Sequence, residues 1–497
     1  MELKKQTFPY YEIVLEAGAS PEAGADMIVP DMFPDIAHIL DTSGQACIKE
    51  KILREGRLDV SGLIRACIVY FPEGEQGLWK LDVNIPFNHV FDGEFPINSE
   101  ALCEIRLASV HARTVNPRKV QVLCGLEIDT EVYAPAEKSL PQHLEGDCQV
   151  RKKSCTAYMP IGVKCKSFTV TESLEIPGTR PPVQEILRAG PRLTVSDVKA
   201  VGNKAVFKGG IVLQMSYMSD GGLNYIEQEF SLSQIIEFES LEEGAEVNLS
   251  LMPTGVEIDL GQQGQIDGHV LGISLHIEAQ AVAWAERQME AVVDAYSTSC
   301  RLKALFSESV MTELVDRGVR RQSIRELIEA GDDIRAVTDT RVVLGRVLRK
   351  EEGHYECIAG VDIVYQRENG EYGSLSRRIP VALSGEIPNE SKIKASLNDE
   401  LTAVPTAGGI ELRFFVDFSL FAIRETRLMT VNEVEKEEWD TPPKHKSVVL
   451  LRCQAGKSLW DIAKMYHTTI DDLCAVNELE DCENISEGQL ILIPKKR

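Results

Sequence analysis

The sequence has no long apolar run, and this absence excludes a membrane-spanning helix. Apolar runs such as Val448–Leu451 fall far short of the ~18 residues that a membrane span needs. The first residues, Met1–Thr7, include two lysines, but no apolar segment follows them. We therefore expect neither membrane insertion nor a secretory signal peptide.

Basic residues are few beside the acidic ones. Lys and Arg total 53 against 77 Asp and Glu, which gives a formal net charge of −24. No run of five or more Lys or Arg occurs anywhere in the sequence. A surface of this charge repels phosphate backbones and anionic lipids, so we expect no nucleic-acid partner.

Cysteine is also sparse, with 12 residues in a chain of 497. Most cysteines stand singly in apolar stretches, as Cys67 and Cys474 do, which is typical of reduced, buried thiols in a cytoplasmic protein. No C-x-x-C occurs, and the closest cluster is spaced more widely than zinc ligand pairs: Cys148, Cys155 and Cys165. The sequence therefore predicts no metal site and a cytoplasmic location.

The familiar catalytic motifs are missing. There is no G-x-x-x-x-G-K-[ST], no H-E-x-x-H and no G-x-S-x-G, and the nine histidines are scattered. Acidic residues are abundant, but no motif singles out a carboxylate pair of the kind that hydrolyses glycans. We expect a protein that is not an enzyme, with no catalytic residues and no cofactor.

A repeated pattern divides the chain. Three segments carry apolar residues at i, i+3 and i+4, which indicates one face of a short helix: Ile36–Leu40, Val183–Leu187 and Ile324–Ile328. Three apolar strands then end in Tyr70, Tyr217 and Tyr365, which lie 147 and 148 residues apart. A polar turn containing glycine follows each tyrosine, as in a hairpin.

This pattern predicts a mainly β, multidomain fold. We expect three tandem β-rich domains, each with a short helix, over residues 1–150, 151–295 and 296–432. Residues 433–446 are charged and include Pro442-Pro443, which indicates a linker.

The final segment, 447–497, has a different pattern, in the order strand, helix, helix, strand. Ser458 with Asp461 is a capping-box signature for the first helix, and Thr469 with Asp472 opens the second in the same way. The apolar run Leu490–Ile493 is the expected closing strand.

This segment resembles a LysM domain, a βααβ module that binds N-acetylglucosamine glycans such as peptidoglycan. The resemblance rests on Gly456–Ala463, Tyr466, Leu473, Asn477 and Gly488–Pro494. It implies a binding groove between the loop that opens the first helix and the loop that follows the second.

The resemblance assigns nine residues to this groove: Gly456, Lys457, Ser458, Leu459, Trp460, Asn477, Ile485, Ser486 and Gly488. Asn477 is expected to end the second helix in a left-handed conformation. Either Leu459 or Trp460 is expected to present apolar surface outward as an interface anchor. The family usually has Asp-Thr where this chain has Lys457-Ser458, and the reversed charge favours a protein partner over a glycan.

The three repeats resemble SPOCS domains, which occur in spore-coat-associated proteins of clostridia. The features that carry the resemblance are the Ile36, Val183 and Ile324 segments, the strands that end in tyrosine, and the junction Asp294–Thr298. The combination with a C-terminal LysM domain implies a spore coat assembly protein in the mother cell, at the forespore surface. It also implies docking on the ATPase that forms the scaffold of the coat.

Three functions therefore follow from the sequence. The first is a non-enzymatic spore coat or envelope assembly protein that docks through its LysM domain on a coat scaffold protein. The second is a protein that binds peptidoglycan of the cell wall or spore cortex. The third is a cell-wall hydrolase anchored by LysM, for which the repeats offer no catalytic signature.

Overall fold

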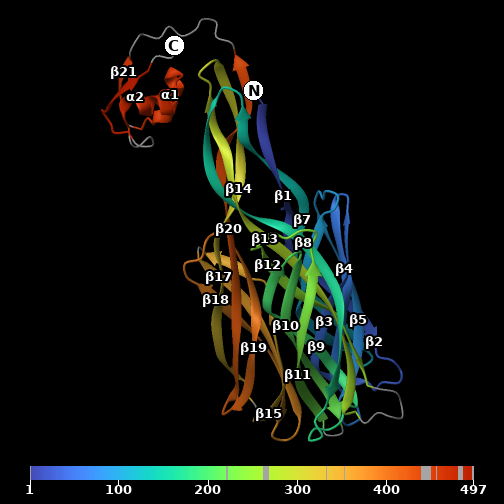
Figure 1. The fold of residues 1–497 in the computed structure, drawn as a ribbon. Coiled ribbons are helices and arrows are strands. Elements are labelled where there is room, and N and C mark those ends of the chain that lie inside the picture. The colour runs from blue at the N-terminus through green and yellow to red at the C-terminus, as the bar shows by residue number, and fades with distance from the viewer. Residues whose placement is uncertain are drawn as a thin grey trace.

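The computed structural model describes residues 2–219, 222–260, 268–331, 333–351, 353–437, 449–454, 456–479 and 485–494. Strands account for 77% of the structure and helices for 3%, so the prediction of a mainly β chain is confirmed. Within the described ranges the strands form seven antiparallel sheets. The body is elongated and narrows toward one end, where the N-terminus and a small C-terminal module lie (Figure 1).

Unit one consists of two sheets. The first contains β1 (Glu2–Ala19), β2 (Glu22–Ile28), β6 (Glu100–Asn116) and β7 (Lys119–Glu145), and the second contains β3 (Ile36–Arg54), β4 (Arg57–Pro72) and β5 (Trp79–Asp92). Both sheets contribute to one core, in which Ile64 of β4 and Val122 of β7 are fully buried. Burial of this alternating apolar face is what holds the two sheets together.

Units two and three repeat this arrangement. The sheets of unit two contain β8 (Gln149–Glu175), β12 (Glu246–Asp259) and β13 (Val270–Tyr296), and β9 (Glu185–Val201), β10 (Lys204–Ser219) and β11 (Gly222–Glu237). Those of unit three contain β14 (Arg301–Glu329), β19 (Ser391–Thr406) and β20 (Gly409–Glu437), and β15 (Ile334–Leu344), β16 (Leu348–Glu351), β17 (His354–Arg367) and β18 (Tyr372–Ser384). In each unit the first strand pairs with the last, and the last two strands form a hairpin.

The repeated tyrosines lie near the ends of the central strands β4, β10 and β17. Tyr70 donates a hydrogen bond to the carbonyl of Pro34 at 3.2 Å, and Tyr217 donates to the carbonyl of Pro181 at 3.1 Å. Both aromatic rings are buried. Each tyrosine therefore ties the segment that precedes its own sheet to the core of its unit. The strands of the three units span residues 2–145, 149–296 and 301–437. The ranges expected from the sequence are 1–150, 151–295 and 296–432.

The short helix expected in each repeat is wrong. Ile36 opens β3, Val183 precedes β9, and Ile324–Ile328 lies inside β14. In the first copy the physical reason is a β-bulge, because the register of β3 shifts between Ile36 and His38. The extra residue places Ile36 and Ile39, three residues apart, on the core of unit one, as on one face of a helix. In the third copy no bulge is needed, because the alternation of β14 already places Ile324 and Ile328, four residues apart, on one face.

The ladders also correct the third copy of this element. Ile39 lies opposite Tyr70 in unit one, and Ile186 lies opposite Tyr217 in unit two. In unit three the residue opposite Tyr365 is Val337 of β15, not a residue of the 324–328 segment. The bulges of β15 fall beside Val337, as those of β3 fall beside Ile39.

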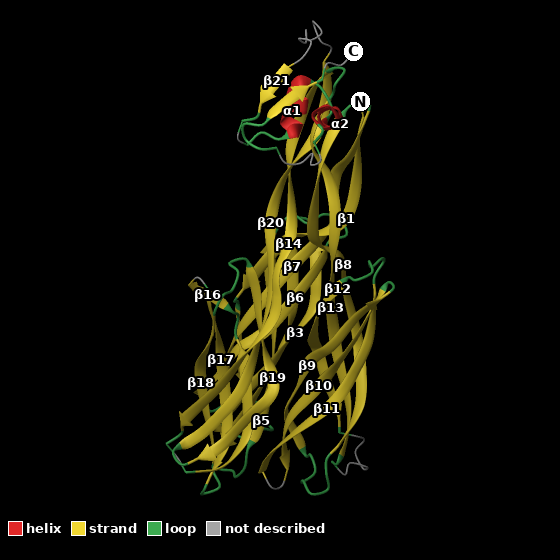
Figure 2. Cartoon of the chain, turned by 60° about the vertical axis from the view of Figure 1, so that its left-hand side comes forward, coloured by secondary structure: helices red, strands yellow, loops and turns green. Residues whose placement is uncertain are grey.

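The longest strands continue beyond the sheets as three two-stranded ribbons, β1 with β7, β8 with β13, and β14 with β20 (Figures 1 and 2). Side chains from one ribbon bond to backbone carbonyls of another. Arg287 donates to Pro9 O at 2.8 Å, and Thr312 donates to Tyr158 O at 2.5 Å. These bonds satisfy backbone groups at strand edges that would otherwise pair with another chain.

The expected linker at 433–446 begins later in the structure. Residues 433–437 are the end of β20, and Glu437 pairs with Arg301 at the start of β14. Cross-strand ion pairs explain why these charged residues form a strand, since Lys303 lies 3.1 Å from Glu435. The remaining residues, 438–446, lie outside the described part of the chain.

The sheets that contain the repeated tyrosines, one from each unit, meet at a buried ionic cluster. Asp41, Arg188 and Asp339 occupy the same position in β3, β9 and β15, two residues after the one that faces the repeated tyrosine. Arg341 lies between the two carboxylates, 2.7 Å from Asp41 and 3.2 Å from Asp339, and Arg188 lies 3.1 Å from Asp339. We call these four residues the axial cluster, and they join all three units.

Candidate binding site

The C-terminal module consists of β21 (Val449–Arg452), α1 (Leu459–Tyr466), α2 (Ile470–Asn477) and β22 (Leu490–Ile493). The predicted strand, helix, helix, strand order is therefore confirmed. β21 pairs with β22, and both helices pack on one face of this sheet. The module core contains Leu459, Ile462, Ala463, Leu473 and Ile491, all of them at most 1% exposed.

The first loop of the expected groove is fixed by the start of α1. Gly456 has φ +80°, a left-handed conformation that favours glycine. Ser458 is the N-cap: its backbone N–H and hydroxyl bond to the Asp461 carboxylate at 2.9 and 2.8 Å, and its hydroxyl accepts the Asp461 N–H. These hydrogen bonds hold the pKa of the Asp461 carboxyl below its ordinary value. Lys457, between Gly456 and Ser458, is partly exposed.

We expect Ser458→Ala to destabilise the module by about 1 kcal/mol, because it removes the side-chain acceptor of the Asp461 N–H at the start of α1. Hydrogen exchange of the α1 amides measures the loss, and Ser486→Ala is the control because the Ser486 side chain is exposed. The Asp461 carboxyl has a lowered pKa in the folded state. Its contribution to the stability of the module is therefore present above the pKa of the unfolded state and is lost as the pH falls through the pKa of the folded state. Equal exchange in both variants at neutral pH would contradict the capping role.

Asn477 does not end the second helix in a left-handed conformation. It is the last residue of α2, and the left-handed residue is Glu478, with φ +50°. The Asn477 side chain instead joins helix to strand: its amide donates to Leu473 O at 2.8 Å and Leu492 O at 2.7 Å, and its oxygen accepts from Leu492 N at 2.6 Å. Asn477 therefore holds α2 against β22.

The second loop is hydrogen-bonded to the segment that precedes the first loop. Gly488, with φ +84°, donates its N–H to the carbonyl of Cys453 at 2.9 Å. Ile485 packs on the module core, and the backbone N–H of Ser486 bonds to the Gln489 side chain at 3.0 Å. The structure thus brings 485–488 next to the segment that leads into Gly456, as a groove between these loops requires.

Leu459 and Trp460 do not face solvent. Leu459 is 1% exposed in the module core, and Trp460 is 7% exposed. The expectation that one of them presents apolar surface outward is wrong because the body covers Trp460. Its indole N–H donates to Asp294 at 2.7 Å, and its ring lies edge-on to Tyr296 with centroids 4.9 Å apart. No sequence signal links residues this far apart in the chain.

The cysteine expectation also needs one correction. Cys474 is disulfide-bonded, whereas the sequence predicts it to be reduced. A small module buries little apolar surface and gains stability from a cross-link. The ten cysteines found as free thiols include all three of the cluster at 148–165. In the part of the chain that the structure describes, no three His, Cys, Asp or Glu side chains could hold a metal ion together.

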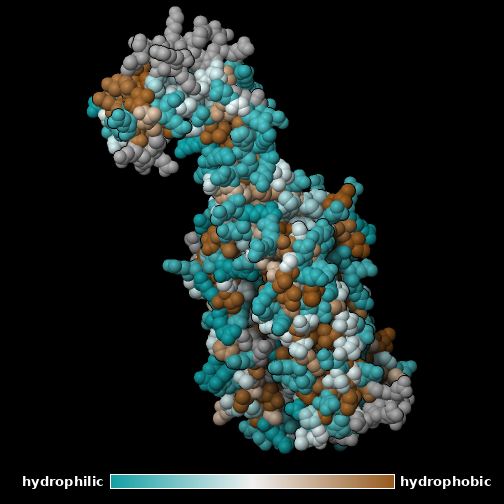
Figure 3. Space-filling view, in the orientation of Figure 1, coloured by the Kyte–Doolittle hydropathy of each residue, from teal (hydrophilic) through white to brown (hydrophobic). Residues whose placement is uncertain are grey.

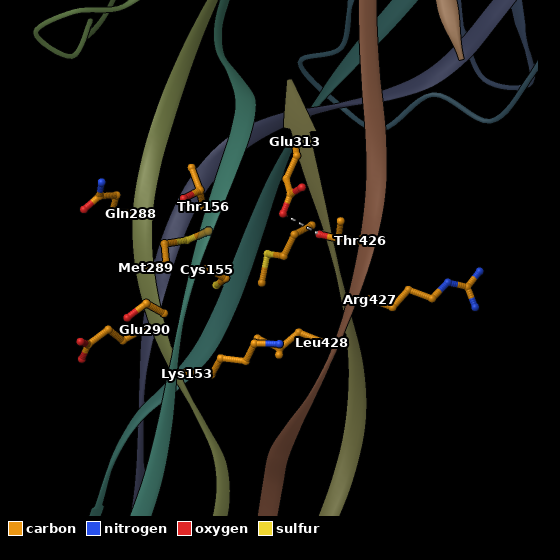
Figure 4. Close-up of a pocket in the computed structure, with 12 residues that line it drawn as sticks. Lys153, Cys155, Thr156, Gln288, Met289, Glu290, Glu313, Thr426, Arg427 and Leu428 are labelled. Atoms are coloured by element: carbon orange, nitrogen blue, oxygen red, sulfur yellow. Dashed lines mark hydrogen bonds between the residues drawn. The ribbon is translucent and has the colours of Figure 1, made fainter. Parts of the chain in front are cut away.

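A second candidate site, which the sequence does not indicate, is a cavity of about 800 Å³ between the ribbons of units two and three (Figure 4). Met289, Met311 and Leu428 are buried on its apolar side, and Lys153 and Glu290 lie at its exposed edge. Burial raises the pKa of the Cys155 thiol, which disfavours the nucleophilic thiolate. The lining comes from four strands, so no local motif could reveal it.

Two family models match the chain. The LysM domain model matches residues 454–494, and the SipL, SPOCS domain model matches residues 182–260, which span β9 to β12 of unit two. The search of curated proteins found no match, and neither did the search of solved structures. Neither helix of the described residues is long and apolar enough to cross a membrane. The two matched domains support a sporulation-related protein that binds peptidoglycan.

Proposed function

We propose that this chain is a non-enzymatic assembly protein of the spore coat or envelope, located in the mother-cell cytoplasm at the forespore surface. Its LysM module docks on the ATPase that forms the coat scaffold. The SPOCS match in unit two and the LysM match on the same chain support a role in sporulation. The three units serve as a spacer and as a platform for further contacts.

The observation that carries the protein-docking proposal is an exposed apolar face on the module. Leu450 of β21 and Leu490 of β22 are 60% and 58% exposed, and the pairing of the two strands places them on the same face of the sheet. The space-filling view shows hydrophobic surface on the C-terminal module (Figure 3). An exposed apolar patch fits a protein partner better than a glycan, which offers mainly hydroxyl groups.

The platform role follows from how the units are joined. The axial cluster and the bridges between ribbons hold the three units in one arrangement. Weak contacts on several units would then add to the weak binding of one small module, because a tethered second contact forms at high effective concentration.

The experiment compares binding of the full chain to the purified coat scaffold ATPase and to purified peptidoglycan. We expect the double variant Leu450→Ser, Leu490→Ser to lose about tenfold or more in scaffold affinity (~1.4 kcal/mol) and to keep its peptidoglycan retention. Met465→Ser is the matched control, because Met465 is 52% exposed on α1, away from the sheet. Equal scaffold affinity in all three proteins would reject the docking face.

Binding of peptidoglycan through the groove is the second candidate, and it is supported by the LysM match and by the bond that holds Gly488 to Cys453, just before the first loop. Lys457→Asp restores the residue usual in the LysM family and leaves the Ser458 cap intact. If the groove binds glycan, this variant should bind peptidoglycan several-fold more tightly and the scaffold no better. If the module docks only on protein, glycan retention should not change. Lysis of cell walls by the full chain would contradict the non-enzymatic proposal.

A further inference from the structure

The end of β13 and the residue after it form a surface on which the LysM module sits. We call Asp294, Tyr296 and Ser297 the junction surface. The Asp294 carboxylate accepts two hydrogen bonds from α1: the Trp460 indole N–H at 2.7 Å and the Lys464 ammonium at 2.6 Å. Trp460 and Lys464 are four residues apart, so they lie on one face of the helix.

Tyr296 and Ser297 extend this contact to the end of α1. The Tyr296 hydroxyl donates to the carbonyl of Thr468 at 2.8 Å, and its burial raises the pKa of this phenol to about 12. His467 Nδ1 lies 3.3 Å from Ser297 O. Ser297 in turn donates to Asp147 O at 2.7 Å, in the segment that joins units one and two. The module therefore contacts the point where all three units connect.

This contact is specific in its chemistry. Tyr296 and Ser297 are 3% and 1% exposed, and Asp294 retains 21% of its side-chain surface. A partly buried carboxylate with two donors, one of them cationic, forms charge-assisted hydrogen bonds that are stronger than neutral ones. The edge-on pair of Tyr296 and Trp460 beside this carboxylate fixes the orientation of α1 on the junction surface. The Trp460 side of α1 is thereby matched to the junction surface.

The chain itself favours the contact. β20 ends at Glu437, which pairs with Arg301, and Arg301 lies only five residues after Tyr296. Residues 438–448 then connect β20 to β21. Eleven residues span at most about 40 Å, so the module cannot move far from the junction surface. A tether of this length gives an effective concentration on the order of millimolar, at which even a weak contact is populated.

We propose that the junction surface is a binding site for the α1 face of the LysM module, and that it competes for Trp460 with a glycan bound in the groove of the module. Trp460 follows directly after the first groove loop, and in the docked state the body covers it. The competition rests on the proposed function, because it requires the module to bind a ligand. Docking lowers the apparent affinity for that ligand by the ratio of docked to free module.

Docking is tested first, without any ligand. A carbodiimide joins a carboxylate to an amine only when the two are in contact, so the full chain should give an intramolecular cross-link between Asp294 and Lys464. Tyr296→Ala keeps both reacting groups and should reduce this cross-link several-fold, whereas Glu290→Ala on the same strand should not. A full chain without the cross-link, or an equal yield in Tyr296→Ala, would overturn the docking site.

Competition is then measured by titrating purified peptidoglycan and the purified coat scaffold ATPase with the same full-length proteins. Tyr296→Ala and Asp294→Ala should each bind peptidoglycan about tenfold more tightly than the parent and Glu290→Ala. Their affinity for the scaffold ATPase should not change, because the face with Leu450 and Leu490 is exposed in the docked state. Circular dichroism identifies any variant that fails to fold, and two release variants guard against that outcome. Unchanged or weaker peptidoglycan binding by folded release variants rejects competition. If no protein binds peptidoglycan, the second candidate function fails together with competition, while the cross-link still decides docking.

Discussion

Replacing Arg341 with alanine should lower the free energy of unfolding of the body by about 3–5 kcal/mol, the cost of removing one partner from a buried ion pair. Arg341 keeps only 10% of its side-chain surface, and its two terminal nitrogens bind both oxygens of Asp41. It also reaches Asp339 at 3.2 Å. Alanine would leave the Asp41 carboxylate, itself 13% exposed, without its cation.

The matched control is Arg325→Ala. Arg325 also pairs with a carboxylate from a strand of unit three, Glu411, but it retains 68% of its side-chain surface. Exposed pairs contribute ~0–1 kcal/mol, so urea denaturation should give nearly the parental stability for this control. A loss below ~1 kcal/mol for Arg341→Ala would mean that the axial cluster does not hold the units together.

The pH dependence provides an independent check. Burial alone would raise the pKa of Asp339, but Arg188 and Arg341 hold it below its ordinary value. A carboxyl with a lowered pKa stabilises the folded state above its unfolded value, ~3.9, and this contribution disappears as the pH falls through the folded pKa. As the pH falls through the folded pKa of Asp339 this carboxylate becomes neutral, so the difference between Arg341→Ala and the parent should shrink. A constant difference would contradict an ionic origin.

The axial cluster also marks a limit of what the sequence can predict. The repeat of Tyr70, Tyr217 and Tyr365 is visible because each unit needs the same buried ring at the same place. Asp41 and Arg188 occupy equivalent positions but differ in sign, because each binds a residue of opposite charge in β15 of unit three: Asp41 binds Arg341, and Arg188 binds Asp339. Complementary charges therefore hide the symmetry from a search for similar residues.

The false helices have a local cause as well. A bulge in β3 places residues three apart on one face, and plain alternation in β14 places Ile324 and Ile328, four apart, on one face. Helices use both spacings, and nothing in the sequence distinguishes the patterns over five residues. The capping box at Ser458 has no such ambiguity, because serine and a carboxylate three residues later satisfy orphan amides only at a helix start. Local chemistry thus predicted the start of α1.

The covering of Trp460 could not be predicted in the same way. Its partner Asp294 lies 166 residues earlier in the chain. The sequence singles out the Asp294–Thr298 junction and the start of α1 separately, and only the fold brings them into contact. A residue expected to face outward because of its type therefore lies against the body of the protein.

Leu473→Ala should abolish the fold of the LysM module and every activity that depends on it. Leu473 of α2 is fully buried in the module core, and removing its side chain should cost about 2–5 kcal/mol. A module of this size has a total stability of only a few kcal/mol, so such a loss leaves it largely unfolded. The body has separate cores and should keep its own unfolding transition.

Val476→Ala is the control, because Val476 lies on the same helix but is 42% exposed. Hydrogen exchange should be fast throughout α1 and α2 in Leu473→Ala and unchanged in Val476→Ala, with the body strands protected in both. Retention on peptidoglycan, scaffold binding and the Asp294–Lys464 cross-link should disappear together in Leu473→Ala, since all three need a folded module. Binding that survived while the helices exchanged freely would place the binding surface on the three β units instead of the module, and would remove the basis for both the proposed docking face and the competition for Trp460.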